Sequence, residues 1–289
     1  MIDNFAVIIL TYKRPDRVYT YTTLRRAGYT GRVIFILSND DPTINEYKRN
    51  YPDVEIITFD KSDYMQPPKY DLLDNDWEST SVPNFARNAA FDIAVELGLE
   101  YFLELDDDYT QFAYRFDGNL DYYPPGLSIS HLDDIFAAYL EFLETSGFYS
   151  ICMAQGGDFI GGKYAKIAKR IAMKFKAMNT FFITTKRPFR FLGRFNEDVN
   201  TYVHMNYTGR LMATHPMVSI VQIQSQAQPG GVTELYRQFG TYRKSFYPIL
   251  LHPAGVKITM LHTKHRRIHH HITYDATVPK IVPESIRKL

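Results

Sequence analysis

Cysteine is nearly absent from this 289-residue sequence. Its single cysteine, Cys152, cannot form a disulfide within the chain, which excludes the small secreted folds held by several bridges. We expect Cys152 to be a small buried hydrophobic residue. The sequence also lacks any apolar run near the roughly 20 residues that a membrane-spanning helix requires, and its opening residues do not resemble a secretory leader. These absences predict a soluble, cytoplasmic protein with no membrane partner.

Acidic residues are scarce in the second half of the chain. Residues 161–289 carry 21 Lys and Arg but five Asp and Glu, a net charge of +16, whereas residues 1–160 carry a net charge of −15. The overall charge of +1 hides this division. A strongly basic half needs an anionic partner, an acidic neighbouring half, or both. Binding of a polyanion and mutual neutralisation of the two halves both fit the pattern.

Strands alternate with helices in the first hundred residues. We expect strands within residues 5–10, 33–37, 53–63 and 100–108, and helices within residues 16–28 and 84–98. This alternation predicts the α/β class, with a Rossmann-type, mostly parallel sheet that binds ligands at the carboxyl ends of its strands. Polar residues follow three of these strands, at Thr11-Tyr12, Asn39-Asp40 and Asp106-Asp107-Asp108. We therefore expect these polar residues to gather at one edge of the sheet.

The second half of the chain is less regular. We expect a helix at residues 130–147, with Ser130 as its cap and Gly147 as its stop, and strands at residues 179–185, 217–226, 246–251 and 256–261. The sequence contains neither an internal repeat nor a low-complexity linker. We therefore predict one continuous domain, residues 1–289, with a nucleotide-sugar-binding half (1–110) and an irregular acceptor-binding half (111–289).

Three consecutive carboxylates follow the fourth predicted strand. Like charges this close repel one another, and carboxylates without partners are costly to desolvate. Asp106 and Asp108 form a D-x-D pair, which can hold a hard divalent cation such as Mg²⁺ or Mn²⁺ on a diphosphate. A solvated loop is the simpler alternative for a motif this short.

These segments together resemble the nucleotide-binding half of a GT-A glycosyltransferase. The resemblance rests on "VIILTYKRPD", "SNDD", "ARNAAFDIA" and "FLELDDD". It implies the following nucleotide-sugar contacts: Thr11, Tyr12 and Arg14 lining the pocket, Asp40 near the base or ribose, Arg87 neutralising the nucleotide, and Asp106 facing the sugar and ribose. It also implies that Asp106 and Asp108 serve the metal ion.

Two later motifs extend the resemblance. "NEDV" is similar to the E-D motif of inverting GT-A enzymes, which implies that Asp198, or Glu197 in its place, is the general base that deprotonates the acceptor hydroxyl. A late histidine completes the metal site in several GT-A enzymes, and His262 is the first candidate within "MLHTKHRRIHHHI". The remaining histidines, with Arg266 and Arg267, favour a basic surface.

The blocks "MNTFFITTKRPFRFLGRFNEDVNTYV" and "GTYRKSFYPILLHPAGVKI" resemble the TET-associated glycosyltransferases of bacteriophages. In that family an oxygenase hydroxylates 5-methylcytosine in phage DNA, and the transferase adds a sugar to the 5-hydroxymethyl group. The resemblance implies a UDP-sugar donor, transfer of a hexose or N-acetylhexosamine, DNA containing 5-hydroxymethylcytosine as partner, and a location in the host cytoplasm. The basic second half supports such an acceptor independently, and we expect Lys244, Ser245, Arg266, Arg267 and the lysine-rich stretch 163–176 to lie near DNA phosphates. That stretch could equally be the solvated face of a helix.

Other functions also fit parts of the sequence. The same transferase machinery could act on a glycan or a protein, and a decayed transferase fold could bind DNA without catalysis. An iron-dependent oxygenase, which the histidine-rich tail suggests, would need a closely spaced H-x-D pair, and that tail does not contain one. The hydroxymethyl group projects into the major groove, so insertion into the groove and flipping of the base are both open routes to it.

Overall fold

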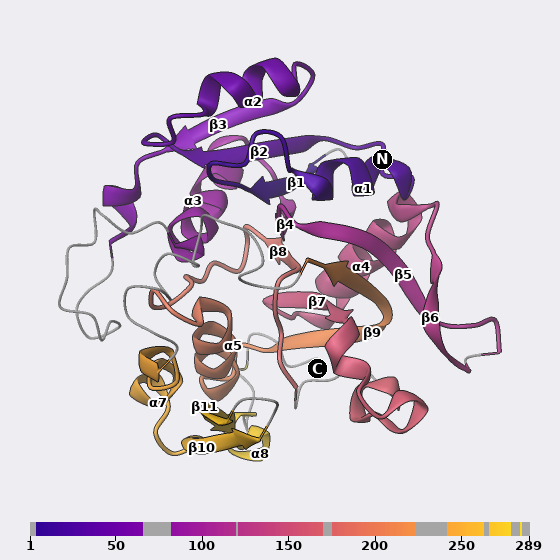
Figure 1. Ribbon diagram of the computed structural model, residues 1–289, viewed down its shortest axis with the longest axis vertical. Helices are drawn as coiled ribbons and strands as arrows, with labels where there is room; N and C mark the ends of the chain where they lie inside the picture. The colour runs from indigo at the N-terminus through magenta and orange to yellow at the C-terminus, as the bar shows by residue number, and fades with distance from the viewer. Residues whose placement is uncertain are drawn as a thin grey trace.

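The computed structural model of the chain describes residues 4–65, 82–119, 121–169, 175–223, 242–262, 266–278 and 284. Most of its strands belong to one mixed sheet: β1 (Phe5–Leu10), β2 (Val33–Ser38), β3 (Glu55–Phe59), β4 (Tyr101–Asp106), β5 (Tyr109–Phe116), β6 (Tyr122–Ser128), β7 (Ser150–Gln155), β8 (Phe181–Thr184) and β9 (Met212–Gln222). Across the described residues the nine strands lie in the order β3-β2-β1-β4-β8-β7-β9-β5-β6 (Figure 1). A separate hairpin pairs β10 (Val256–His262) with β11 (Arg266–Ile272).

The first four strands of this order run parallel and end at one edge. β1 lies between β2 and β4, and Leu10 at its end is level with both Ile36 and Asp106. The strand ends carrying Thr11, Asn39 and Asp106 therefore lie at the same edge of the sheet, as predicted. The α/β class and the parallel first half are confirmed, and the other half of the sheet is mixed because β8 is antiparallel to both β4 and β7.

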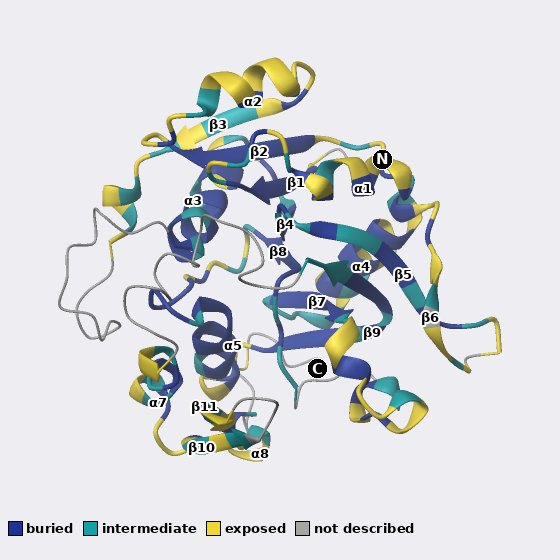
Figure 2. Cartoon of the chain, in the orientation of Figure 1, coloured by how far each residue is buried: buried dark blue, intermediate teal, exposed yellow. Residues whose placement is uncertain are grey.

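Helices cover both faces of the sheet. The helices among the described residues are α1 (Tyr19–Arg26), α2 (Ile44–Asn50), α3 (Pro83–Glu96), α4 (Leu132–Ser146), α5 (Glu197–Tyr207), α7 (Tyr247–Leu251) and α8 (Tyr274–Thr277). Alternate residues of β1 point to opposite faces: Val7 and Ile9 pack in the cluster containing α1 and α4 residues, whereas Ala6 and Ile8 pack in the cluster containing α3 and α5 residues. All six residues of β1 are consequently buried (Figure 2).

Two local predictions need correction. Residues 246–251 were expected to form a strand, which is wrong: Tyr247–Leu251 is the helix α7. Pro248 lies in its first turn, where the fixed φ of proline suits a helix and the missing N–H needs no partner. The helix at 130–147 is present, but His131 rather than Ser130 occupies its N-cap position; Gly147 ends it with φ +71°, as predicted.

The sheet includes strands from both sides of residue 110, and the boundary between a nucleotide half and an acceptor half stays a prediction. Cys152 on β7 is fully buried and free, as expected. Within the described ranges, no helix has the length and apolar character that crossing a membrane would require.

Candidate functional site

The three aspartates after β4 occupy three different environments. Asp107 is buried and accepts hydrogen bonds from Thr11 Oγ1 and Arg14 Nη1, both at 2.8 Å. Asp106 instead accepts a hydrogen bond from Arg87 Nη2 at 2.9 Å. Pairing with separate arginines therefore reduces the mutual repulsion of Asp106 and Asp107. Thr11 and Arg14, which the sequence placed in the nucleotide pocket, hold the middle aspartate in this structure.

Asp108 differs from its neighbours because its Oδ1 is buried with no hydrogen-bond partner among the described residues. Burial and the negative charges of Asp106 and Asp107 raise the pKa of Asp108 to about 7. A buried carboxylate oxygen without a donor is costly, and a cation at that position would remove the cost. This orphaned oxygen and the nearby Asp106 are a donor set that fits Mg²⁺ or Mn²⁺.

The rest of a metal shell is not supplied by protein side chains in the described ranges. No group of three or more His, Cys, Asp and Glu side chains there has the arrangement of a metal site. His262 ends β10, and its side chain lies outside the part of the chain that the structure describes. The assignment of His262 as a metal ligand therefore stays a prediction.

Arg87 lies on α3 and forms ion pairs with residues of β4 and with the first residue of α5. Its guanidinium is 2% exposed and donates to Glu104 Oε1 at 2.5 Å, Asp106 Oδ1 at 2.9 Å and Glu197 Oε1 at 3.2 Å. The rings of Phe181 and Phe191 lie 5.3 and 5.5 Å from it. Although burial opposes the shift, three carboxylates around this one cation raise the pKa of Arg87, so the guanidinium is charged. Its predicted contact with the nucleotide remains a prediction.

Glu104 was not identified from the sequence. It is fully buried within β4, and burial raises its pKa to about 7 although Arg87 opposes the shift. Two signals pointed to it: it stands two residues before Asp106, on the same face of the strand, and it interrupts an apolar run. A carboxylate in a buried strand requires a cationic partner, and Arg87 is that partner.

The E-D motif forms the first turn of α5. Asn196 precedes the helix with φ +52°, and Glu197 then reaches Arg87. Asp198 is 8% exposed, and its Oδ1 accepts the backbone N–H of Val199 at 2.7 Å. Burial raises the pKa of Asp198, while the positive charges of Arg87 and Lys176 oppose this.

Lys244, before α7, and His270, on β11, lie near the start of α5. Asn196 Nδ2 donates to the backbone oxygen of Lys244 at 2.8 Å and lies 3.5 Å from His270 Nδ1. Burial and the charge of Arg267 lower the pKa of Lys244, whereas Asp198 opposes the shift. Burial lowers the pKa of His270 to about 3, so this imidazole is neutral. These contacts attach the start of α5 to the segment before α7 and to β11.

The other predicted DNA contacts are divided between surface and interior. Arg266 and Arg267 are exposed on β11. Ser245 is fully buried, and its hydroxyl donates to the backbone oxygen of Ile268 at 3.2 Å. This hydrogen bond joins Ser245, in the segment before α7, to β11.

The two remaining predicted nucleotide contacts lie at the same sheet edge. Asp40 pairs with Lys61 Nζ at 2.6 Å, and although burial opposes it, this partner and Ser38 lower the pKa of Asp40. Tyr12 is half-buried, with Lys13 Nζ 4.9 Å from the centre of its ring. Asp41, which the sequence did not single out, accepts the backbone N–H of Lys13 at 2.7 Å and holds this loop.

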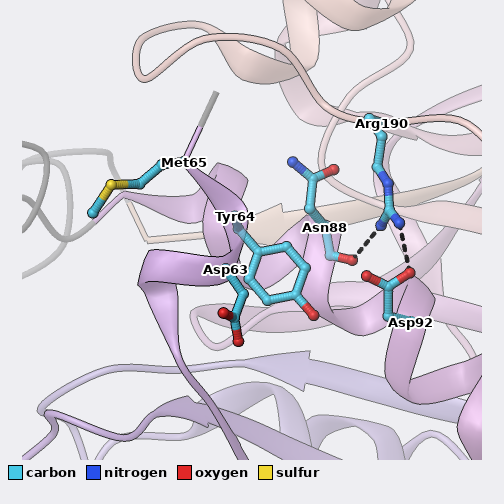
Figure 3. A pocket seen from close by; sticks show the side chains of 6 residues that line it. All are labelled: Asp63, Tyr64, Met65, Asn88, Asp92 and Arg190. Atoms are coloured by element: carbon cyan, nitrogen blue, oxygen red, sulfur yellow. Dashed lines mark hydrogen bonds and ion pairs between the residues drawn. The ribbon is translucent and has the colours of Figure 1, made fainter. Parts of the chain in front are cut away.

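A shallow pocket of about 190 Å³ lies elsewhere, between η1 (Lys61–Tyr64) and α3. Arg190 there donates to Asp92 Oδ1 at 2.6 Å and to the backbone oxygen of Asn88 at 2.9 Å (Figure 3). The Asn88 side chain is bonded to the backbone of Phe191, and none of the predicted site residues lines the pocket. We therefore place the functional site at the strand ends rather than in this pocket.

The buried network makes a prediction for stability. Arg87→Met should lower the free energy of unfolding by about 3–5 kcal/mol, because three carboxylates lose their buried cation. Glu104→Gln keeps an acceptor for Arg87 and removes one buried charge, so its loss should be smaller. Arg49→Met, on the exposed face of α2, should change stability by less than about 0.5 kcal/mol. Urea unfolding followed by circular dichroism measures all three, and a fully stable Arg87→Met protein would contradict the network's role.

Comparison with known proteins agrees with the resemblance seen in the motifs. No curated protein matches the chain. Among solved structures, glucosyl-3-phosphoglycerate synthase from Mycobacterium tuberculosis, in complex with Mn²⁺, UDP and phosphoglyceric acid, is similar with a TM-score of 0.45 and 10% sequence identity; the match covers 93% of this chain and 87% of that chain. Residues 5–231 match the model of the family described as TET-Associated Glycosyltransferase, a match that ends before the "GTYRKSF" block. Because this match spans most of the sequence, the chain belongs to the TET-associated glycosyltransferase family and is a glycosyltransferase.

Proposed function

We propose that this glycosyltransferase moves a hexose or N-acetylhexosamine from a UDP-sugar to the hydroxyl of 5-hydroxymethylcytosine in phage DNA. One observation carries the proposal: a single guanidinium, that of Arg87, contacts both Asp106 of the D-x-D motif and Glu197 of the E-D motif. Donor-side and acceptor-side carboxylates are therefore within a few ångströms of each other, as direct transfer between two substrates requires. The family's association with TET-type oxygenation supports a hydroxylated base as the acceptor.

On the donor side, Asp108 and Asp106 are the residues that would hold Mg²⁺ or Mn²⁺. When bound, such an ion supplies Lewis-acid neutralisation of the charge on the departing diphosphate. Arg87 and Arg14 hold Asp106 and Asp107 in fixed orientations, so the edge is organised before the donor arrives. Tyr12 is half-buried beside this edge and suits stacking on the uracil ring.

On the acceptor side, Asp198 is the group that we propose takes the proton from the attacking hydroxyl. Its burial in the first turn of α5 raises its pKa, which makes it a stronger base than an exposed aspartate. Glu197 fixes this turn through Arg87, and Asn196 fixes it through the backbone of Lys244. A base opposite the leaving group implies inversion at the anomeric carbon.

The DNA would lie on the basic surface beside α5. Arg266 and Arg267 are exposed on β11, and Lys244 lies near Asp198, so their positive charges suit the phosphates that flank the modified base. Burial and the charge of Arg267 lower the pKa of Lys244, and a phosphate between these two cations would relieve their repulsion.

The reaction itself is the first prediction. Incubation of the purified chain with UDP-sugars and hydroxymethylated DNA should increase the mass of the 5-hydroxymethylcytosine nucleoside by one hexose or one N-acetylhexosamine, as measured by mass spectrometry of digested DNA. Unmodified DNA and 5-methylcytosine DNA offer no hydroxyl and are the matched controls. Transfer to glycans or proteins in place of DNA would reject the proposed acceptor.

Asp198 generates a second prediction. Asp198→Asn should lower kcat by about 10²–10⁴-fold, because an amide retains the contact with Val199 N–H but cannot accept the proton. In the unsubstituted chain, kcat/KM should rise with pH as Asp198 loses its proton, because only the deprotonated carboxylate acts as base. The midpoint of this rise should lie above the ordinary pKa of aspartate, because burial raises the pKa of Asp198. Transfer assays from about pH 4 to about pH 9 test this rise. Asp134→Asn, on the exposed side of α4, is the control, and full activity of Asp198→Asn would remove it from the mechanism.

The third prediction concerns Asp108. Asp108→Asn should weaken Mn²⁺ binding in the presence of UDP by at least about 10-fold, because one charged oxygen ligand becomes a neutral one. Titration calorimetry, or the electron paramagnetic resonance signal of free Mn²⁺, measures this without any turnover. Asp121→Asn, in the exposed turn between β5 and β6, is the control. Equal Mn²⁺ affinity in both variants would show that Asp108 does not hold the ion.

A further inference from the structure

The segment after β7 displays two large apolar side chains to solvent. It consists of three short 3-10 turns, η3 (Gly156–Phe159), η4 (Gly162–Tyr164) and η5 (Lys166–Lys169). Ile160 is 85% exposed and Tyr164 is 76% exposed, the two highest values among the exposed large hydrophobic residues described. We name residues 156–166 the apolar tip. Strong exposure of neighbouring apolar residues marks a contact surface more often than it marks chance.

Buried side chains and hydrogen bonds hold the base of the apolar tip in place. Phe159, Ala165 and Ile167 are buried in a small cluster, and the Phe159 ring stacks on Tyr122 with centroids 5.4 Å apart. Asp158 accepts the backbone N–H of Gln155 at 2.8 Å and pairs with Lys176 Nζ at 2.7 Å. Ile160 and Tyr164 are therefore held outward by an ordered base, which distinguishes the tip from a loosely packed loop.

The direction of the strands places this tip beside the site. β8 is antiparallel to both β4 and β7, so β4 and β7 run the same way and end at the same edge. One strand separates them, a distance of about 10 Å. Through Phe182 on β8, Leu103 of β4 is level with Ile151 of β7, so Gln155 ends β7 at about the level of Asp107. The apolar tip thus begins at the edge that carries the acidic motif.

Lys176 links the tip to the acceptor side of the site. It pairs with Asp158 at the base of the tip, and its charge also acts on Asp198, where it opposes the rise in pKa that burial causes. Lys176 is therefore a shared neighbour of the base of the tip and of Asp198.

The exposed charged side chains of the tip itself are lysines. Lys163 and Lys166 are exposed, and Lys163 Nζ lies 5.2 Å from the centre of the Tyr164 ring. The sequence contains no Asp or Glu between Asp158 and Glu197. Lysines beside an aromatic and an aliphatic side chain match a partner that alternates phosphates with flat apolar rings. Nucleic acid has this alternation, and a protein or glycan surface does not.

We propose that the apolar tip is a DNA-contacting element of this enzyme, in which Lys163 and Lys166 bind phosphates while Tyr164 and Ile160 contact bases next to the modified cytosine. This rests on the proposed DNA acceptor. Apolar side chains inserted at a base step unstack it, and an unstacked step makes a neighbouring base easier to expose. The tip would in this way present the hydroxymethyl group to Asp198.

Fluorescence anisotropy with a hydroxymethylated duplex tests the proposal. Tyr164→Ala should weaken DNA binding by about 5- to 100-fold, the range found when an aromatic that stacks on a base is removed. Lys163→Ala with Lys166→Ala should also reduce the slope of log Kd against log salt by about 1 for each phosphate that the variant no longer binds. The exposed residues Tyr207 and Lys48 provide matched controls, and neither Tyr207→Ala nor Lys48→Ala should alter affinity.

Steady-state kinetics separates this proposal from the proposed function. The tip variants should raise the KM for DNA and leave the KM for the UDP-sugar unchanged, with thermal unfolding unaltered because the substituted side chains are exposed. Wild-type transfer to DNA together with unchanged DNA affinity in all tip variants would overturn the tip's role and leave the function standing. Absence of any transfer to hydroxymethylated DNA would reject the function instead. If the tip variants lost binding to anionic phospholipid vesicles that the unsubstituted chain binds, and kept their DNA affinity, the tip would be a membrane-contacting element. That result would also overturn the proposed DNA contact.

Discussion

The site depends on one buried ion cluster, the guanidinium of Arg87 among the carboxylates of Glu104, Asp106 and Glu197. Burying an arginine or a carboxylate alone is costly, and the cluster forms because each charge offsets the desolvation of another. Its geometric consequence matters more than its energy. Glu104 and Asp106 belong to β4, Glu197 begins α5, and Arg87 lies on α3, so the cluster fixes segments that are far apart in sequence. The substrate edge of the sheet is built on this connection.

The division of charge along the sequence has a spatial counterpart in ion pairs that join the two halves. Lys176, Lys186 and Arg190 of the basic half pair with Asp158, Glu100 and Asp92 of the acidic half, respectively. Partial neutralisation between the halves, one of the two sequence interpretations, therefore occurs where the halves meet. It leaves Arg266, Arg267 and the lysines of the apolar tip exposed, so neutralisation and binding of a polyanion are compatible rather than alternative.

Much of the first half could be predicted from the sequence because its signals are local. Apolar strands of five or six residues, separated by helices, defined the parallel sheet and brought Thr11, Asp40 and Asp106 to one edge. The internal pairing could not be predicted, because Thr11 and Arg14 bind Asp107 across more than ninety residues and nothing local distinguishes that contact from a nucleotide contact. The apolar pattern of residues 246–251 fits a strand or a buried helix equally well, and packing against α5 decided for the helix.

Three neighbouring carboxylates are tolerated after β4 because the strand ends there and the chain sends them in different directions. Arg14 neutralises Asp107 and Arg87 neutralises Asp106, which leaves Asp108 with one buried oxygen that no described donor satisfies. A solvated acidic loop would expose all three side chains and would need neither arginine. The observed arrangement instead shares one arginine among three carboxylates and leaves a further buried oxygen on Asp108, so negative charge remains at the substrate edge. Electrostatics of this kind favours a divalent cation brought with a diphosphate, and it explains why the acidic motif is built into the fold rather than displayed on its surface.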